Sequence, residues 1–396
     1  MTLVKPSLPL IFRYLIRLRW IGIAVFIPIT FTTSESILIS LVVNIIPLLT
    51  TFFCFIYVVS SKFTKLHLIF YLIICFSFIQ MFFNNGDYYF AIKHLYYDLL
   101  FFSSLFFGYK ILNNTESIML FVNELNKNLK YEILFFVIYF ILYSLGYINY
   151  YGFQVNMFIY ILIILCFGKN KNKYLKALLL LLIAILSGKR AAMILAVIPF
   201  LLCIYYLESI KRKTFLLFLG GLFLVLTINY NERIIQSLIL ISEIDYPTLF
   251  ELDNFNLALL TSGRSLEIQS VIIKIIESPL NLFYGFGYGT SYFSEGIGLA
   301  FFERTSPYLH FTPLYFILVH GLIGLYFTFV IPINRLLRIK KFIFSNKISF
   351  FLFSIVICIL AMSAFGNVYI ADPLAGLIIG ALISVTSKQS NLFKTI

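Results

Sequence analysis

The sequence predicts an all-α, polytopic integral membrane protein with about twelve transmembrane helices and one large extracytoplasmic loop. Apolar residues make up 61% of the chain and charged residues only 12%, whereas soluble proteins carry about 25% charged residues. The apolar runs are also continuous, as in Ile37–Val59 and Phe311–Ile333. Only helices satisfy their own backbone groups in lipid over such lengths, since the strands of a barrel alternate apolar with polar residues.

The apolar runs divide the chain into spanning segments. The predicted spans cover residues 20–33, 37–59, 66–84, 95–110, 131–149, 152–168, 175–187, 191–207, 214–230, 311–333, 348–366 and 369–386. Residues 1–230 form a bundle of spans one to nine behind a basic lead-in, residues 231–311 form the loop, and residues 312–396 return as spans ten to twelve. The lead-in lacks the cleavage site of a signal peptide.

The basic residues predict the orientation of these spans. With the N-terminus in the cytoplasm, 23 of the 30 basic residues fall in cytoplasmic segments. The seven on the other side are Lys93, Lys189, Arg190, Arg233, Arg264, Lys274 and Arg304. This bias follows the positive-inside rule and places both termini in the cytoplasm. Because the net charge of +13 is distributed in this way, it indicates topology, and no nucleic-acid partner is expected.

The loop at residues 231–311 is the one long segment without a predicted span. Long loops are usually functional. Part of it has the apolar spacing of an amphipathic helix, at Leu266, Ile268, Val271, Ile272, Ile275 and Ile276. We expect short helices lying over the outer membrane face.

Several of the basic residues outside the cytoplasm have unusual surroundings. Only about twelve apolar or small residues separate Lys176 from Lys189, enough for about 18 Å of helix against a hydrocarbon core of about 30 Å. Arg190 should therefore lie in a recess below the outer surface, where charges mark functional sites. The alternative is a tight turn whose Lys189 and Arg190 extend to the headgroups.

Two further motifs lie in the loop. Arg264 follows Ser262, which is suited to cap the amphipathic helix; a solvated arginine on a surface helix is the alternative. The run Gly285-Phe286-Gly287-Tyr288-Gly289 has glycines that let backbone N–H groups approach a phosphate. It lacks the lysine and spacing of a P-loop, and a plain turn is the alternative.

His310 lies where the loop returns to the bundle, next to Tyr308 and Leu309. His67 and His94 lie at the edges of predicted spans, and His320 is about 15 Å deeper along span ten. We therefore expect His320 to matter much less than His310. Gly321 and Gly324 are interpreted as sites of close helix packing.

The order of these motifs over roughly residues 175–333 resembles the O-antigen polymerase and O-antigen ligase superfamily of bacterial envelopes. A recessed Ser-Gly-Lys-Arg is followed by an outer loop with Ser-Gly-Arg, by Gly-x-Gly-x-Gly, and by a histidine that opens the next span. The chain departs from the family at Phe311, where members often have Asn. The resemblance implies transfer of a glycan from undecaprenyl pyrophosphate to a sugar hydroxyl at the outer face of the bacterial cytoplasmic (inner) membrane.

The resemblance also implies roles for individual residues. Arg190, Lys189 and Arg264 would bind the pyrophosphate, since arginine matches phosphate geometry with two parallel hydrogen bonds. His310 would be the general base for the acceptor hydroxyl. Weaker candidates for substrate contact are Arg304, Gly285, Gly287 and Tyr308.

The expected partners are the lipid-linked donor and acceptor, the bilayer, a chain-length regulator and a flippase. No cofactor or metal is expected, and the five cysteines lie in apolar runs. A polymerase of repeat units for O-antigen or capsule is the first hypothesis. A ligase that moves glycan to lipid A–core shares the same donor chemistry. A flippase or other transporter is the alternative of a different class, although such proteins often have two similar halves.

Overall fold

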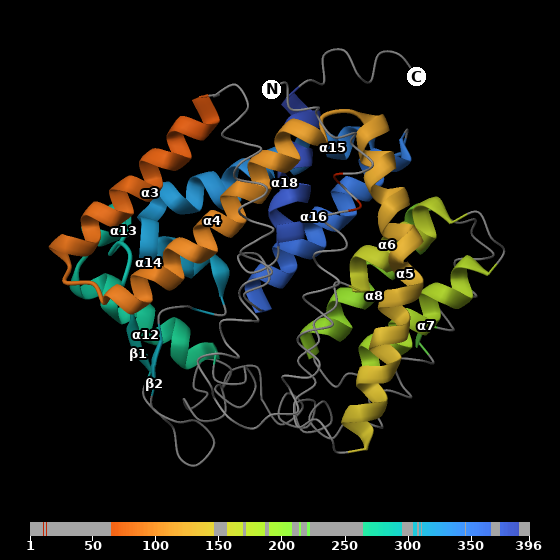
Figure 1. Ribbon diagram of the computed structural model, residues 1–396, viewed down its shortest axis with the longest axis horizontal. Coiled ribbons are helices and arrows are strands. Elements are labelled where there is room, and N and C mark those ends of the chain that lie inside the picture. The colour runs from red at the N-terminus through yellow and green to blue at the C-terminus, as the bar shows by residue number, and fades with distance from the viewer. Residues whose placement is uncertain are drawn as a thin grey trace, which may run out of the picture.

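The protein is almost entirely helical in the computed structural model (Figure 1). The structure describes residues 65–145, 157–168, 172–186, 190–207, 264–294, 304–306, 311–344, 346–365 and 373–387, with residues 11, 13, 214, 220, 221 and 309 singly. Within these residues the only strands form one short two-stranded sheet. The predicted all-α class is therefore confirmed.

The first described part of the chain contains six helices. They are α3 (Lys65–Phe83), α4 (Tyr88–Ile111), α5 (Thr115–Ser144), α6 (Met157–Phe167), α7 (Lys173–Leu186) and α8 (Arg190–Leu207). Asp87 begins α4 as its N-cap, because its carboxylate accepts hydrogen bonds from the N–H groups of Tyr89 and Phe90.

The second part begins inside the predicted loop. Its elements are α12 (Arg264–Glu277), α13 (Asn281–Tyr284), β1 (Tyr292–Ser294), β2 (Arg304–Ser306), α14 (Thr312–Leu325), η3 (Tyr326–Val330), α15 (Ile331–Ile339), η4 (Lys340–Phe342), α16 (Lys347–Phe365) and α18 (Pro373–Ser387). The strands pair antiparallel, with Tyr292 opposite Ser306. The short loop helices were predicted, whereas the sheet was not.

Helices occur where apolar runs predicted spans, with some changes of length. The runs 66–84, 191–207 and 348–366 match α3, α8 and α16 closely, while α4 and α5 begin before their predicted spans. Span ten is one helical path, but it is interrupted within α14 and passes through the π-helix η3. Spans 20–33 and 37–59, and most of 214–230, lie outside the described residues.

One helical run in the described part is long and apolar enough to cross a membrane by length and composition. It covers the 31 residues Thr312–Phe342, within which an 18-residue window has a mean hydropathy of 2.1. Apolar stretches of 10–17 residues also occur within α3, α6, α8, α16 and α18. The count of about twelve spans therefore stays a prediction.

The close contact between α4 and α18 depends on glycine. A Cβ atom added at Gly376 would lie 2.6 Å from the carbonyl oxygen of Phe101, and one added at Gly380 would overlap the carbonyl oxygen of Leu105. The two glycines are four residues apart and share a helix face, the small-xxx-small arrangement that lets helix backbones approach.

Gly380→Val should therefore destabilise the protein by about 1–3 kcal/mol, because the obstructing atoms belong to the α4 backbone and cannot rotate away. The thermal midpoint of the purified protein in detergent is the measurement. Gly221→Val is the matched control, since a Cβ added at Gly221 meets no atom within 4 Å. Equal midpoints for the two variants would contradict this account of the interface.

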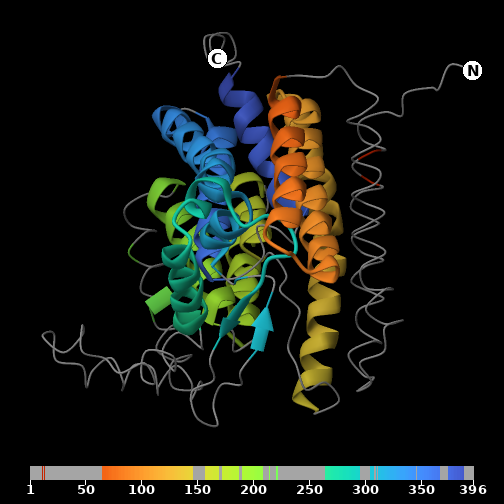
Figure 2. The same ribbon diagram turned by 90° about the vertical axis from the view of Figure 1, so that its left-hand side faces the viewer.

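We refer to residues 264–294, the longest described part of the predicted loop, as the loop segment. It lies at one end of the helices. In Figures 1 and 2, α12, α13 and the two strands lie beside the turn between α3 and α4, whereas the end of α4 and α15 lie at the opposite end. The second half of α14 lies beside this segment, since the carbonyl oxygens of Leu318 and Val319 accept hydrogen bonds from Phe286 and Gly287. The predicted loop is therefore packed against the helices along residues 264–294.

Candidate functional site

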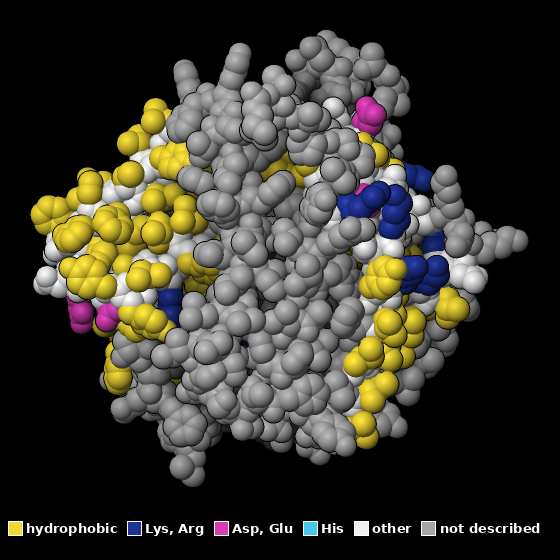
Figure 3. Space-filling model, in the orientation of Figure 1, with side chains coloured by type: hydrophobic (Ala, Val, Ile, Leu, Met, Phe, Trp, Pro, Cys, Tyr) yellow, Lys and Arg dark blue, Asp and Glu magenta, His cyan; other side chains and the backbone are white. Residues whose placement is uncertain are grey.

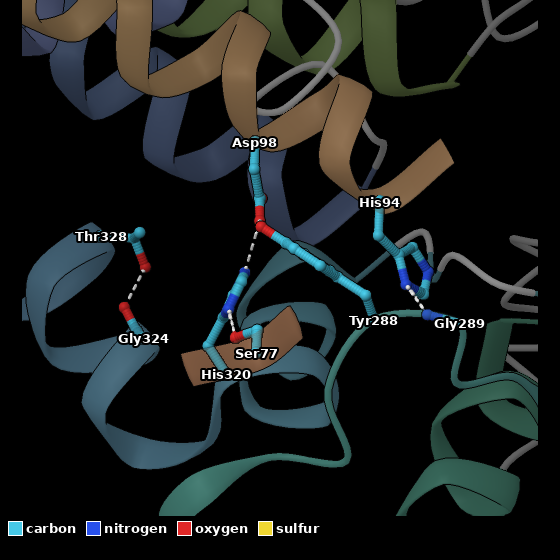
Figure 4. A network of polar contacts seen from close by, with 8 residues as sticks. All are labelled: Ser77, His94, Asp98, Tyr288, Gly289, His320, Gly324 and Thr328. Carbon is cyan, nitrogen blue, oxygen red and sulfur yellow. Dashed lines mark hydrogen bonds and ion pairs between the residues drawn. The ribbon is translucent and has the colours of Figure 1, made fainter. Parts of the chain in front are cut away.

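Four polar side chains meet inside the helices, and we refer to Ser77, Asp98, Tyr288 and His320 as the buried polar cluster (Figure 4). His320 Nε2 lies 2.9 Å from Asp98 Oδ2, and its Nδ1 lies 2.6 Å from Ser77 Oγ. The Tyr288 hydroxyl donates to Asp98 Oδ2 at 2.6 Å. All four residues are buried, at 3% exposure or less. The cluster joins α3, α4, α14 and the glycine run of the loop segment.

A break in α14 makes room for this cluster. Gly321 follows His320 and has φ of +68° and ψ of −165°, a non-helical conformation that favours glycine. A side chain there would collide with the carbonyl oxygen of Phe283 and lie 2.6 Å from the Gly285 nitrogen. Gly321 was interpreted as a site of close helix packing, and it lets α13 and the residues that follow it approach α14.

Gly324 leaves space for the His320 side chain, because a Cβ atom added there would overlap the Cβ of His320. One turn further, the Thr328 hydroxyl donates to the Gly324 carbonyl oxygen at 2.7 Å, within the π-helical stretch. The two glycines thus shape α14 around its buried histidine.

The glycine run, Gly285–Gly289, packs against α14 and α3 through backbone hydrogen bonds. Phe286 N–H donates to the carbonyl oxygen of Leu318 at 2.8 Å, and Gly287 N–H donates to that of Val319 at 3.0 Å. Tyr288 N–H donates to the Ser77 carbonyl oxygen at 2.9 Å.

Gly285, Gly287 and Gly289 all have positive φ. Gly285 N–H donates to the Asn281 carbonyl oxygen at 2.7 Å. The N–H groups of Gly285 and Gly287 therefore donate to backbone carbonyl oxygens within the protein, and a role of these glycines in substrate contact stays a prediction.

His94 also contacts the glycine run. Gly289 N–H donates to its Nδ1 at 3.2 Å, which leaves the ring proton on Nε2. His94 and His67 are both fully buried, and the His67 ring stacks on Phe106 at 4.3 Å. His67 lies in the first turn of α3, at the edge of its predicted span, whereas His94 lies within α4, and packing from other helices buries both.

Lys274 connects α12 to the glycine run. Its Nζ donates to Thr290 Oγ1 at 3.0 Å and to the carbonyl oxygen of Ser291, and lies 4.9 Å from the centre of the Phe286 ring. Burial lowers the pKa of the Lys274 ammonium below its ordinary value, partly offset by Glu277. The helix that begins at Arg264 is thereby held to the segment that enters the bundle.

The structure describes only some of the residues that the sequence singled out. Arg264 is the first residue of α12 and is partly buried. Arg190 begins α8, and Arg304 lies opposite Ser294 in the sheet, but their side chains are not among those described. Lys189, Tyr308 and His310 lie outside the described residues. The roles proposed for these residues therefore stay predictions.

The buried polar cluster has the groups of a nucleophilic triad but is closed. A serine hydroxyl, an imidazole and a carboxyl group are in contact, and these are the groups of the catalytic triad of serine hydrolases. However, Ser77 is 1% exposed and Asp98 is fully buried, so no substrate reaches them in this arrangement. Among the described residues, no three His, Cys, Asp or Glu side chains are placed to hold a metal ion. The cluster is therefore a polar joint between elements.

Sequence reasoning overlooked Asp98, although a signal was present. Asp98 is the single acidic residue in the 24-residue helix α4, and ionisable residues within apolar spans mark functional or structural sites by default.

Comparison with protein-family models, with curated proteins and with solved structures found no match.

Proposed function

We propose that this chain is a membrane glycosyltransferase of the O-antigen polymerase type. It joins undecaprenyl-pyrophosphate-linked oligosaccharide repeat units into O-antigen or capsular polysaccharide at the outer face of the bacterial cytoplasmic membrane. The observation that carries the proposal is the order of motifs, from Ser187–Arg190 through Ser262–Arg264 and Gly285–Gly289 to His310. About twelve spans with both termini in the cytoplasm complete the proposed topology.

Exposed apolar surface supports a membrane location. At least half of the side chain is exposed at Leu68, Leu72, Ile79, Phe82 and Phe83, all on α3. Figure 3 shows hydrophobic side chains gathered at the left, where Figure 1 has α3 and α13. An apolar patch of this kind is rare on a soluble monomer, and lipid would cover it.

The placement of charge supports the proposed orientation. Lys110 ends α4, and Arg335, Arg338, Lys340 and Lys341 lie in α15 and η4. These elements lie at the end opposite α12 (Figure 1). With this basic end in the cytoplasm, α12 and Arg264 lie at the outer face, where the lipid-linked donor would present its pyrophosphate.

The proposed reaction is an inverting displacement. The acceptor hydroxyl oxygen attacks the anomeric carbon of the donor, and the bond from that carbon to the pyrophosphate oxygen breaks. His310 accepts the hydroxyl proton. Arg190 and Arg264, assisted by Lys189, stabilise the charge on the departing undecaprenyl pyrophosphate. Arg304 and Tyr308 are further candidates for contacts with the sugars.

Polymerisation of purified lipid-linked repeat units by the purified protein tests this function. Arg190→Lys and Arg264→Lys should each lower the rate at least about tenfold, because the lysine point charge does not reproduce the paired hydrogen bonds of a guanidinium. Arg338→Lys is the matched control at the opposite end and should leave the rate unchanged. Polymer formation at the normal rate in both of the first two variants would remove the pyrophosphate-binding role.

A deletion strain distinguishes the alternatives through its surface polysaccharide. Loss of a polymerase leaves a single repeat unit on the core. Loss of a ligase leaves bare core while carrier-linked polymer accumulates. Loss of a flippase also leaves bare core, but the lipid-linked units stay at the cytoplasmic face. The absence of two similar halves in the sequence favours the enzyme over the transporter.

A further inference from the structure

We propose that the buried polar cluster positions the loop segment for catalysis, so that docking of the glycine run against the bundle sets the affinity for the lipid-linked donor. Ser77, Asp98, Tyr288 and His320 are then positioning residues, since none of them is accessible to a substrate. This inference rests on the proposed function and extends it to Ser77, Asp98 and His320, which no sequence motif indicated.

The connection from the cluster to Arg264 is continuous. Asp98 accepts the Tyr288 hydroxyl hydrogen bond inside the bundle. Two residues further, Thr290 accepts a hydrogen bond from Lys274, which lies on the same helix as Arg264 at a distance of about 15 Å along the axis. A shift of the glycine run would therefore move α12 and its first residue with it.

The docking of this segment combines directional polar contacts with apolar burial at Val271, Phe286 and Tyr292. Phe286, Gly287 and Tyr288 each donate a backbone hydrogen bond to α14 or α3. By contrast, much of the apolar surface of α12 and α13 faces outward, at Ile272, Ile273, Ile276, Leu280 and Phe283. Because apolar burial contributes less here than in the bundle, loss of one buried polar contact should shift the balance between docked and undocked states.

Such a balance has a kinetic signature. If only the docked state binds the donor, the apparent affinity falls in proportion to the docked fraction. A saturating donor then restores docking, so KM rises while kcat is preserved. General destabilisation would instead reduce the amount of active protein, which lowers the apparent kcat and leaves KM unchanged.

Tyr288→Phe is the test, because it removes one hydroxyl and retains the ring. Tyr315→Phe is a matched control: Tyr315 is also fully buried, but its hydroxyl has no hydrogen-bond partner among the described residues. In the full-length protein, Tyr288→Phe should accelerate amide hydrogen exchange at residues 286–288 about tenfold. Exchange in α16 and α18 should stay unchanged, and Tyr315→Phe should exchange as the unmodified protein does.

The second measurement is the polymerisation assay. We expect the KM for lipid-linked repeat units to rise about tenfold in Tyr288→Phe, with kcat within about twofold of normal. Unchanged exchange at residues 286–288, or faster exchange with an unchanged KM, would overturn the positioning role. If the unmodified protein forms no polymer from these units, the proposed function fails, while the exchange result still decides whether the cluster holds the segment.

Discussion

His310→Ala should reduce the rate of polymer formation by roughly 10²–10⁴-fold, the usual contribution of a general base. Without the imidazole, the acceptor hydroxyl must lose its proton to water as it attacks the anomeric carbon. Binding of the donor should remain largely intact, because the arginines would still bind the pyrophosphate. The measurement is polymerisation by the purified variant at saturating donor, together with binding of lipid-linked repeat units.

The thermal midpoint separates His310 from His320. His310→Ala should keep the midpoint of the unmodified protein. His320→Ala should lower it, because Asp98 and Ser77 would lose their imidazole partner. From its position deeper in span ten, His320 was predicted to matter much less than His310. We expect this to hold for the catalytic step but not for the stability of the fold. A near-normal rate for His310→Ala would end its role as base. A strict requirement for a divalent metal would instead point to catalysis by acidic residues of the predicted loop, such as Glu243 and Asp253.

Asp98→Ala should be the most destabilising single substitution among the described residues. Leaving a buried polar group without its partner typically costs about 1–3 kcal/mol, and more for a charged group. Here the Tyr288 hydroxyl would lose its acceptor, and His320 would lose the carboxylate that lies 2.9 Å from its Nε2. The measurement is the thermal midpoint in detergent and the amount of folded protein in the membrane.

Two further variants make this result specific. Asp87→Ala removes an exposed acid from the start of the same helix and should cost only about 1 kcal/mol, the usual contribution of an N-cap. Asp98→Asn keeps an oxygen that can accept from the Tyr288 hydroxyl and should be milder than Asp98→Ala. A loss for Asp98→Ala no larger than that for Asp87→Ala would contradict the role of the cluster.

The sequence by itself determined the helical class, because continuous apolar runs can bury their backbone groups only as helices. It also indicated α12, since an amphipathic repeat is a local signal within a few residues, whereas the predicted cap Ser262 lies outside the described residues. It placed short helices in the long loop for the same reason. The motif order behind the proposed function likewise comes from sequence alone, and the roles of Arg190 and His310 stay predictions.

Only the tertiary structure decided how the loop segment joins the bundle. Ser77 and His320 are separated by 243 positions, and Asp98 and Tyr288 by 190. A buried polar group requires a partner, but many residues could supply one, and periodicity does not select among them. The sequence did not predict the break at Gly321 for a related reason. The run around it is largely apolar, and the atoms that require a glycine there belong to Phe283 and Gly285, in another part of the chain.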